Sequence, residues 1–199
     1  MNHYFINDPS DKNEYRVISF VFDDIPISLI TDRNVFSNRR LDDGTLALLK
    51  VLSRANLEGN FLDLGAGYGP IGLTLKIVNP KLDVTLSDIN ERCIKLININ
   101  KERLHLDVKA VVSDSFLNIT ENFNTISLNS PISCGKKVCF KLYQDAKEHL
   151  ISGGSFYLVI RKDKGALSHM KYLSSLFSEV NVIYKEKGEE VMSRVLVIG

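Results

Sequence analysis

Cysteine and histidine are scarce in this sequence, and tryptophan is absent. The 199 residues contain three Cys, four His and no Trp. The cysteines, Cys93, Cys134 and Cys139, form neither an even set for disulfides nor a C-x-x-C pair. We therefore expect reduced thiols and no bound metal, with Cys93 on a helix and Cys139 in the core.

Long apolar runs and an excess of charge of one sign are also lacking. The N-terminus is polar, and no apolar run reaches the about 18 residues of a membrane-spanning helix. The 25 Lys and Arg nearly balance the 24 Asp and Glu, so any RNA contact must come from a local patch. We expect a soluble, cytoplasmic protein with no membrane partner.

The sequence does have enough apolar residues for one core. With 44% apolar residues, a chain of this length fits a single domain. Residues 14–31 contain two β-rich runs joined by an acidic turn, which predicts a hairpin, and a helix with acidic caps is predicted from Asp42. We predict that residues 1–58 form an N-terminal hairpin and helix, and that residues 59–199 form the core.

In the core, strand and helix patterns alternate. Strands are predicted at 61–64, 83–88, 108–114, 123–129 and 155–161, with helices at 70–78, 90–104, 137–150 and 166–177. This alternation is typical of a parallel sheet covered on both faces. Two closing strands, 180–186 and 191–198, resemble a hairpin. The prediction is an α/β, Rossmann-like fold whose seven-stranded sheet is mostly parallel, with an antiparallel late strand.

Polar residues end four of these strands, namely Asp63, Asp88, Asp114 and Asn129. In such a sheet, ligands bind at the carboxyl ends of the strands. A single Asp in this place is a common turn residue, whereas three in succession followed by Asn favour one lined pocket.

The loop LDLGAGYGPIG, residues 62–72, allows two interpretations. Residues 67–72 satisfy the dinucleotide fingerprint G-x-G-x-x-G, with Asp88 at a suitable distance to bind a ribose. However, the first glycine after the strand is Gly65. Counted from there, Pro70 takes the place of the third glycine and supplies no N–H for a pyrophosphate.

The second interpretation is Asp63-x-Gly65-x-Gly67-x-Gly69, the loop of S-adenosylmethionine-dependent methyltransferases. This cofactor carries no phosphate, so Pro70 at the first helical turn is favourable. The glycines let the backbone approach the cofactor closely.

The acidic strand ends complete the predicted cofactor site. Asp63 would accept from the ammonium group of the cofactor, directly or through water, and Asp88 would accept from both ribose hydroxyls. Asp114, Ser115 and Phe116 would meet the edge and face of the adenine. We therefore predict S-adenosyl-L-methionine as the cofactor.

With these residues the chain resembles the small-domain ribosomal RNA guanine-N2 methyltransferases, in particular the single-domain bacterial form. The resemblance covers nearly the whole chain and includes HYFINDPS, the segment from Thr31 to Ser37, DLGAGYGPIG, SDIN, SDSF, the Asn129 motif and IRKDKGA. It implies a class I methyltransferase that acts on ribosomal RNA or a ribosomal subunit. We also expect a monomer or weak homodimer.

In that family the fourth strand ends in Asn-Pro-Pro and an apolar or aromatic residue, and here the segment reads Asn129-Ser130-Pro131-Ile132. The resemblance assigns catalysis to the first three. The Asn side-chain oxygen and the carbonyl of residue 130 would hold an exocyclic amine with its lone pair toward the methyl group. Ser130 departs from the pattern but keeps this carbonyl, and Pro131 still favours extended geometry before it. Taken alone, these residues are also ordinary turn formers.

Substrate contacts are predicted from apolar and basic residues. Ile132 offers the base an apolar surface, and Phe36 offers a π-face. Three short basic clusters could contact phosphates: Arg39 and Arg40, Lys136 and Lys137, and Arg161, Lys162 and Lys164. We single out Lys136 and Arg161, although a solvated surface explains such clusters equally well.

Two other functions stay open. A protein glutamine-amide methyltransferase would use the same planar geometry, but that family usually has Tyr in place of Ile132 and carries a helical N-terminal module. A ribosome-assembly protein that kept the cofactor pocket and lost turnover would account for Ser130.

Overall fold

The first two strands that the structure describes form an antiparallel hairpin. The computed structural model describes residues 14–35, 39–186 and 189–193. β1 (Tyr15–Phe22) pairs with β2 (Ile25–Asp32) along their full lengths. Asp23 and Asp24 between them have φ of 47° and 62°. Two consecutive positive φ values are typical of a type I′ turn, whose twist suits a tight hairpin, so the predicted hairpin and its acidic turn are confirmed.

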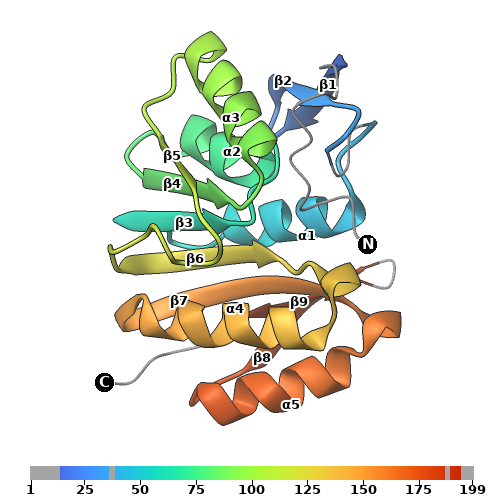
Figure 1. Cartoon of the computed structure of the whole chain (residues 1–199), viewed down its shortest axis with the longest axis vertical. Coiled ribbons are helices and arrows are strands. Elements are labelled where there is room, and N and C mark those ends of the chain that lie inside the picture. Colours follow the sequence, from blue (N-terminus) through green and yellow to red (C-terminus); the bar gives the residue numbers. More distant parts are fainter. Residues whose placement is uncertain (1–13, 36–38, 187–188, 194–199) are drawn as a thin grey trace.

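The central sheet has seven strands in the order β5-β4-β3-β6-β7-β9-β8 (Figure 1). The strands are β3 (Asn60–Leu64), β4 (Asp83–Asp88), β5 (Lys109–Val112), β6 (Phe123–Asn129), β7 (Leu150–Arg161), β8 (Asn181–Glu186) and β9 (Glu189–Ser193). Neighbours from β5 to β7 pair in parallel, whereas β9 is antiparallel to both β7 and β8. The predicted fold class is confirmed. The part of the last predicted strand beyond residue 193 lies outside the described residues.

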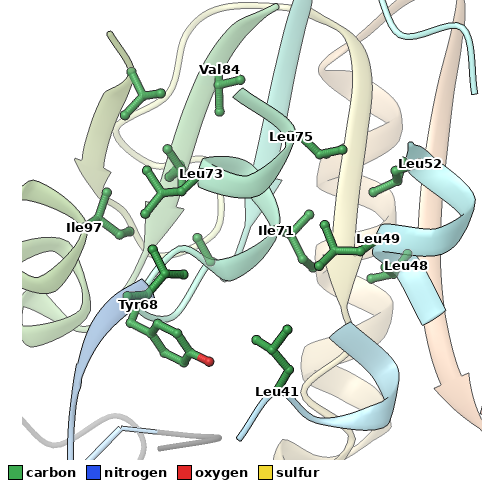
Figure 2. Close-up of a cluster of buried hydrophobic side chains, with 14 of the residues drawn as sticks. Leu41, Leu48, Leu49, Leu52, Tyr68, Ile71, Leu73, Leu75, Val84 and Ile97 are labelled. Atoms are coloured by element: carbon green, nitrogen blue, oxygen red, sulfur yellow. The ribbon is translucent and has the colours of Figure 1, made fainter. Parts of the chain in front are cut away.

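Helices cover both faces of this sheet. They are α1 (Asp43–Leu52), α2 (Pro70–Val78), α3 (Glu91–Arg103), α4 (Lys136–Glu148) and α5 (Ala166–Leu176), with short 3₁₀ turns η2 (Ile132–Cys134) and η3 (Lys162–Lys164). One buried cluster joins the hairpin to α1, α2 and α3, and a second joins α4 to α5. In Figure 1 the hairpin lies beside α1 and away from α4 and α5. Figure 2 shows Leu49 of α1 pointing toward Ile71 of α2 inside the first cluster.

Local chemistry sets where two of these helices begin. Asp42 precedes α1 and accepts from the Thr45 N–H at 3.0 Å and from the Thr45 hydroxyl at 2.7 Å. Asn90 precedes α3 and accepts from the Arg92 N–H at 2.9 Å. Each such cap satisfies a backbone donor that the helix cannot, and typically contributes about 1 kcal/mol.

Buried polar contacts attach the hairpin to the core. Asn100 of α3 accepts from the Ile30 N–H at 2.7 Å and donates to the carbonyls of Ile30 at 2.8 Å and Tyr68 at 3.3 Å. Asp32, at the end of β2, accepts from Arg92 of α3 at 3.2 Å. The hairpin therefore contacts the helix and loop that border the site described below. None of the helices in the described ranges is long and apolar enough to cross a membrane.

Candidate functional site

A cavity of about 1020 Å³ opens at the carboxyl ends of the parallel strands. The strand order reverses between β3 and β6, which is where open α/β sheets bind ligands. The four polar strand ends, Asp63, Asp88, Asp114 and Asn129, all line this cavity. The structure thus brings together side chains that lie up to 66 positions apart in sequence. Ligand pockets usually measure about 300–1,000 Å³, so the cavity has room for a cofactor together with part of a substrate.

The glycine loop between β3 and α2 borders the cavity. Gly65, Gly67 and Gly69 have φ of 67°, 59° and 90°, in the left-handed region that favours glycine. A Cβ on Gly67 would meet no atom within 4 Å, whereas a Cβ on Gly69 would lie 2.8 Å from Leu73 Cδ1. Gly67 therefore leaves an open surface beside the cavity, and Gly69 allows the helix to pack.

Asp88 fixes the loop from the end of β4. Its Oδ2 accepts from the Gly67 N–H at 2.8 Å, and its Oδ1 accepts from the Asn90 N–H at 2.9 Å. Burial raises the pKa of Asp88, while these two N–H groups favour its charged form. The Cys93 thiol also donates to Asp88, and burial raises the pKa of Cys93 well above its usual value. Cys93 lies on α3 as predicted, and it is a thiol there rather than a thiolate.

Asp63 is almost completely buried, with 1% of its surface exposed. Its Oδ2 accepts from the Gly72 N–H at 2.8 Å, and its Oδ1 accepts from the Ser127 hydroxyl at 3.2 Å. Burial raises the pKa of Asp63 to about 7. The carboxyl group thus joins the first turn of α2 to β6, and its contact with a cofactor ammonium stays a prediction.

The segment after β5 differs from the prediction in one respect. Asp114 is exposed and lines the cavity, and so does Ser115, whose hydroxyl donates to Asp145 at 2.6 Å. Ser115 has φ of 52°, a left-handed turn that redirects the chain. The Phe116 side chain is then buried in the cluster of α4 and α5, its ring stacked on His149 with centroids 4.1 Å apart. The prediction that Phe116 meets the adenine face is therefore wrong.

Asn129 ends β6 with both of its amide protons directed at α1. Its Nδ2 donates to Asp42 Oδ1 at 3.0 Å and to the Thr45 hydroxyl at 3.2 Å. Because both amide protons are used, the side-chain oxygen of Asn129 remains available to accept a hydrogen bond from another group. A Cβ on Gly44 would lie 3.2 Å from that oxygen, so the small residue keeps space beside it.

The next residues form a tight turn around Pro131. Its φ of −77° and ψ of 66° are those of an inverse γ-turn, and the Ile132 N–H donates to the Ser130 carbonyl at 2.8 Å. A carbonyl oxygen has two acceptor positions, so one remains for a ligand. Consecutive residues thus offer two oxygen acceptors, from the Asn129 side chain and the Ser130 backbone, at the edge of one cavity.

The predicted substrate contacts are only partly brought to the cavity. Ile132 lines it, as does the exposed Arg161, which pairs with Asp163 at 3.0 Å. Lys136 is exposed at the start of α4 and does not line the cavity. Among the other members of the basic clusters, Arg39, Arg40 and Lys164 line it, whereas Lys137 does not. Phe36 lies outside the described residues.

Sequence reasoning missed the support for the Asn129 turn. Asp42 was expected only as a helix cap, because 87 positions separate it from Asn129 and no local pattern connects them. Tyr143 of α4 fits a buried helical stripe, and nothing in that stripe shows that its hydroxyl lies 3.2 Å from the Ser130 hydroxyl. Cys139, predicted in the core, is buried on the same helix face. Within the described part of the chain, no three His, Cys, Asp or Glu side chains gather as metal ligands would.

The sequence matches the model of the methyltransferase small domain family over residues 26–193. It is 36% identical over 189 residues to the uncharacterized protein YbxB of Bacillus subtilis strain 168, covering 94% of each chain. It is 35% identical over 164 residues to ribosomal RNA small subunit methyltransferase C of Actinobacillus pleuropneumoniae serotype 7, covering 80% of this chain and 49% of the relative. The chain thus spans about half the length of that relative.

A solved structure has the same fold over nearly all of this chain. It is the T. thermophilus 16S rRNA N2 G1207 methyltransferase (RsmC) in complex with AdoMet and guanosine, with a TM-score of 0.82 and 24% identity. The match covers 92% of this chain and 50% of that one. The sequence match and the shared fold agree with each other, and the chain belongs to the methyltransferase small domain family.

Proposed function

We propose that this protein transfers a methyl group from S-adenosylmethionine to the exocyclic N2 amine of a guanine in ribosomal RNA. The observation that carries the proposal is the pair of oxygen acceptors at Asn129 and Ser130, beside the glycine loop in one cavity. The names of two relatives support the substrate class. One is a ribosomal RNA small subunit methyltransferase, and the other methylates N2 of G1207 in 16S rRNA and was solved with AdoMet and guanosine.

The residues of the cavity fit S-adenosylmethionine. The open surface at Gly67 suits close backbone approach, and the glycine loop needs no phosphate because Pro70 occupies the first turn of α2. The Asp88 carboxylate suits ribose hydroxyls, and Asp114 and Ser115 lie at the end of the next strand along the sheet. When bound, the cofactor supplies an electrophilic methyl group on a sulfonium.

Asn129 and Ser130 supply orientation and electrostatic stabilisation. The side-chain oxygen of Asn129 and the carbonyl of Ser130 accept the two N–H groups of the amine, so that the nitrogen lone pair is directed into the cavity. Methyl transfer forms a nitrogen–carbon bond, breaks the carbon–sulfur bond and releases one proton to solvent. Positive charge develops on the nitrogen, and both oxygens are aimed at it.

Asp42 strengthens this acceptor pair. Its carboxylate accepts from the Asn129 amide at 3.0 Å, which both fixes the rotamer of the amide and polarises its oxygen. A flipped amide would present N–H groups to the substrate amine, and the Asp42 carboxylate disfavours that state. We therefore assign to Asp42 the role of orienting the Asn129 amide, and no role in proton transfer.

Basic residues at the cavity provide candidate contacts to phosphates. Arg39 and Arg40 precede α1, Arg161 ends β7, and Lys164 lies just after it. All four are exposed and line the same cavity. A guanine within a helix would have to be unstacked to reach the acceptors, so phosphate contacts beside the cavity suit an extruded base.

The product identifies the function. The protein is incubated with methyl-labelled S-adenosylmethionine and either naked 16S ribosomal RNA or small ribosomal subunits, and digested RNA and protein are analysed by mass spectrometry. We expect labelled N2-methylguanosine, formed far more slowly by Asn129→Ala. Labelled methylglutamine would instead indicate the protein-methylating alternative. Cofactor binding with no labelled product on either substrate would favour a ribosome-assembly protein.

A further inference from the structure

Three buried side chains form a hydrogen-bonded chain behind the Asn129 turn. The Ser130 hydroxyl lies 3.2 Å from the Tyr143 hydroxyl of α4, which lies 2.9 Å from Nδ1 of His169 on α5. Ser130, Tyr143 and His169 are 9%, 0% and 1% exposed. These three hydrogen-bonded side chains connect the end of β6 to α4 and α5. The proposed function gives no role to Tyr143 or His169.

The protonation states allow one consistent arrangement of donors along this network of side chains. Burial, followed by the charge of Lys136, lowers the pKa of His169, so its imidazole is neutral at neutral pH. Burial raises the pKa of Tyr143, which therefore remains a phenol. The Tyr143 hydroxyl can then donate to Nδ1 of His169, and its oxygen accepts from the Ser130 hydroxyl. The hydroxyls of Ser130 and Tyr143 and Nδ1 of His169 are then all hydrogen-bonded, as buried polar groups require.

A second contact joins the same helix face to the turn. Cys139 lies four residues before Tyr143 on α4, so the two side chains lie on one face. The Cys139 thiol donates to the Pro131 carbonyl at 3.7 Å, and burial raises the pKa of the thiol to about 11, so that it keeps its proton. α4 therefore contacts two consecutive residues of the turn, Ser130 and Pro131.

We infer that Tyr143, itself held by His169, is a positioning residue that fixes Ser130 and with it the backbone carbonyl that accepts the substrate amine. The inference rests on the proposed function. In the resembled family a proline also stands in the place of Ser130 and restricts the backbone angle φ there, whereas a serine leaves φ free. The hydrogen bond to Tyr143 restores the restriction from the side chain. The hydrogen bond between Ser130 and Tyr143 thus restricts the backbone at residue 130, as a proline does in the family.

The inference is tested by measuring methyl-transfer turnover after the Tyr143 hydroxyl is removed. Tyr143→Phe keeps the ring and removes the partner of Ser130. Tyr172→Phe is the matched control, because Tyr172 belongs to the same aromatic cluster and stacks on Phe140 at 4.0 Å, whereas the Ser130 hydroxyl pairs with Tyr143. We expect Tyr143→Phe to lower kcat about tenfold, the factor one ordinary hydrogen bond supplies. KM for S-adenosylmethionine and the kcat of Tyr172→Phe should stay near wild type.

Rescue separates positioning from a general loss of structure. Ser130→Pro in the Tyr143→Phe background should recover most of the lost kcat, because proline restricts φ without a hydroxyl. The Ser130 N–H that it removes makes only a long bond, 3.4 Å to the Val159 carbonyl. Equal kcat for Tyr143→Phe and Tyr172→Phe, or no rescue by proline, would overturn the inference.

Thermal unfolding tests the coupling without activity. If Tyr143 fixes Ser130, Ser130→Ala combined with Tyr143→Phe should unfold at the same temperature as the less stable single variant. Additive losses would contradict a direct interaction. If the wild type transfers no methyl group, the proposed function fails, and these unfolding temperatures still decide whether Tyr143 holds the turn.

Discussion

Replacing Asp42 tests whether the Asn129 amide must be oriented from α1. Asp42 Oδ1 receives two hydrogen bonds, from the Asn129 amide at 3.0 Å and from the Thr45 N–H at 3.0 Å. The bond from Asn129 orients its amide, and the bond from Thr45 caps α1. Asp42→Ala removes both, so it should lower both turnover and stability.

The two effects have different sizes. A hydrogen bond to a charged group contributes about 1.5–3 kcal/mol, so loss of the bond to Asn129 should lower kcat by about 10- to 100-fold. Loss of a helix cap costs about 1 kcal/mol of folding stability. Asp42→Ser keeps a capping oxygen and loses the carboxylate. Asp42→Asn keeps an oxygen that can accept both bonds, and it loses the charge and the acceptor of the Thr45 hydroxyl.

Single-turnover methyl transfer and urea unfolding should therefore rank the variants differently. We expect kcat to fall in the order wild type, Asp42→Asn, Asp42→Ser, with Asp42→Ala equal to the serine variant. We expect only Asp42→Ala to lose stability. Cofactor affinity, measured by calorimetry, should stay near wild type in all three. If Asp42→Ser retains wild-type turnover, or if turnover follows stability, Asp42 does not orient the amide.

Two further predictions concern the cofactor side of the cavity. Asp88→Ala should weaken S-adenosylmethionine binding by about 1.5–3 kcal/mol for each lost ribose contact. It should also lower stability, because the Gly67 and Asn90 N–H groups lose their acceptor. Wild-type binding by calorimetry, or a gain of NADH binding, would contradict the assignment. Asp63 keeps its proton in the folded protein up to a pKa of about 7, whereas its ordinary value is 3.8, so it costs stability as the pH rises between these values. Asp63→Asn cannot ionise, and its unfolding free energy relative to wild type should rise by roughly 4 kcal/mol from pH 4 to pH 8 in urea titrations. A flat or falling difference would contradict the raised pKa.

The sheet and the location of the site could be predicted from local patterns. Alternating strands and helices determine a parallel sheet, because crossover connections of that length place helices on its faces. The carboxyl ends of its strands then meet at one edge. For that reason the sequence alone places Asp63, Asp88, Asp114 and Asn129 in one cavity, as the structure has them.

The remaining details depend on contacts between distant segments. The direction of Phe116 follows from a positive φ at Ser115, which an L-residue rarely adopts and a sequence pattern does not indicate. The hydrogen bond from Asn129 to Asp42 joins the fourth core strand to the helix after the hairpin. In the sequence Ser130 is only a departure from the family pattern, whereas the structure gives its hydroxyl a buried partner on α4.

Single-turnover methyl transfer by wild type and Asn129→Ala tests the central claim most directly. The assay uses saturating S-adenosylmethionine on the ribosomal RNA substrate, with cofactor affinity measured in parallel by calorimetry. We predict that the substitution lowers the rate by about 10²–10³, the range for removal of one preorganised transition-state contact, and leaves cofactor affinity near wild type. A fully active Asn129→Ala variant would contradict the account, because the residues after β6 would then be only a turn.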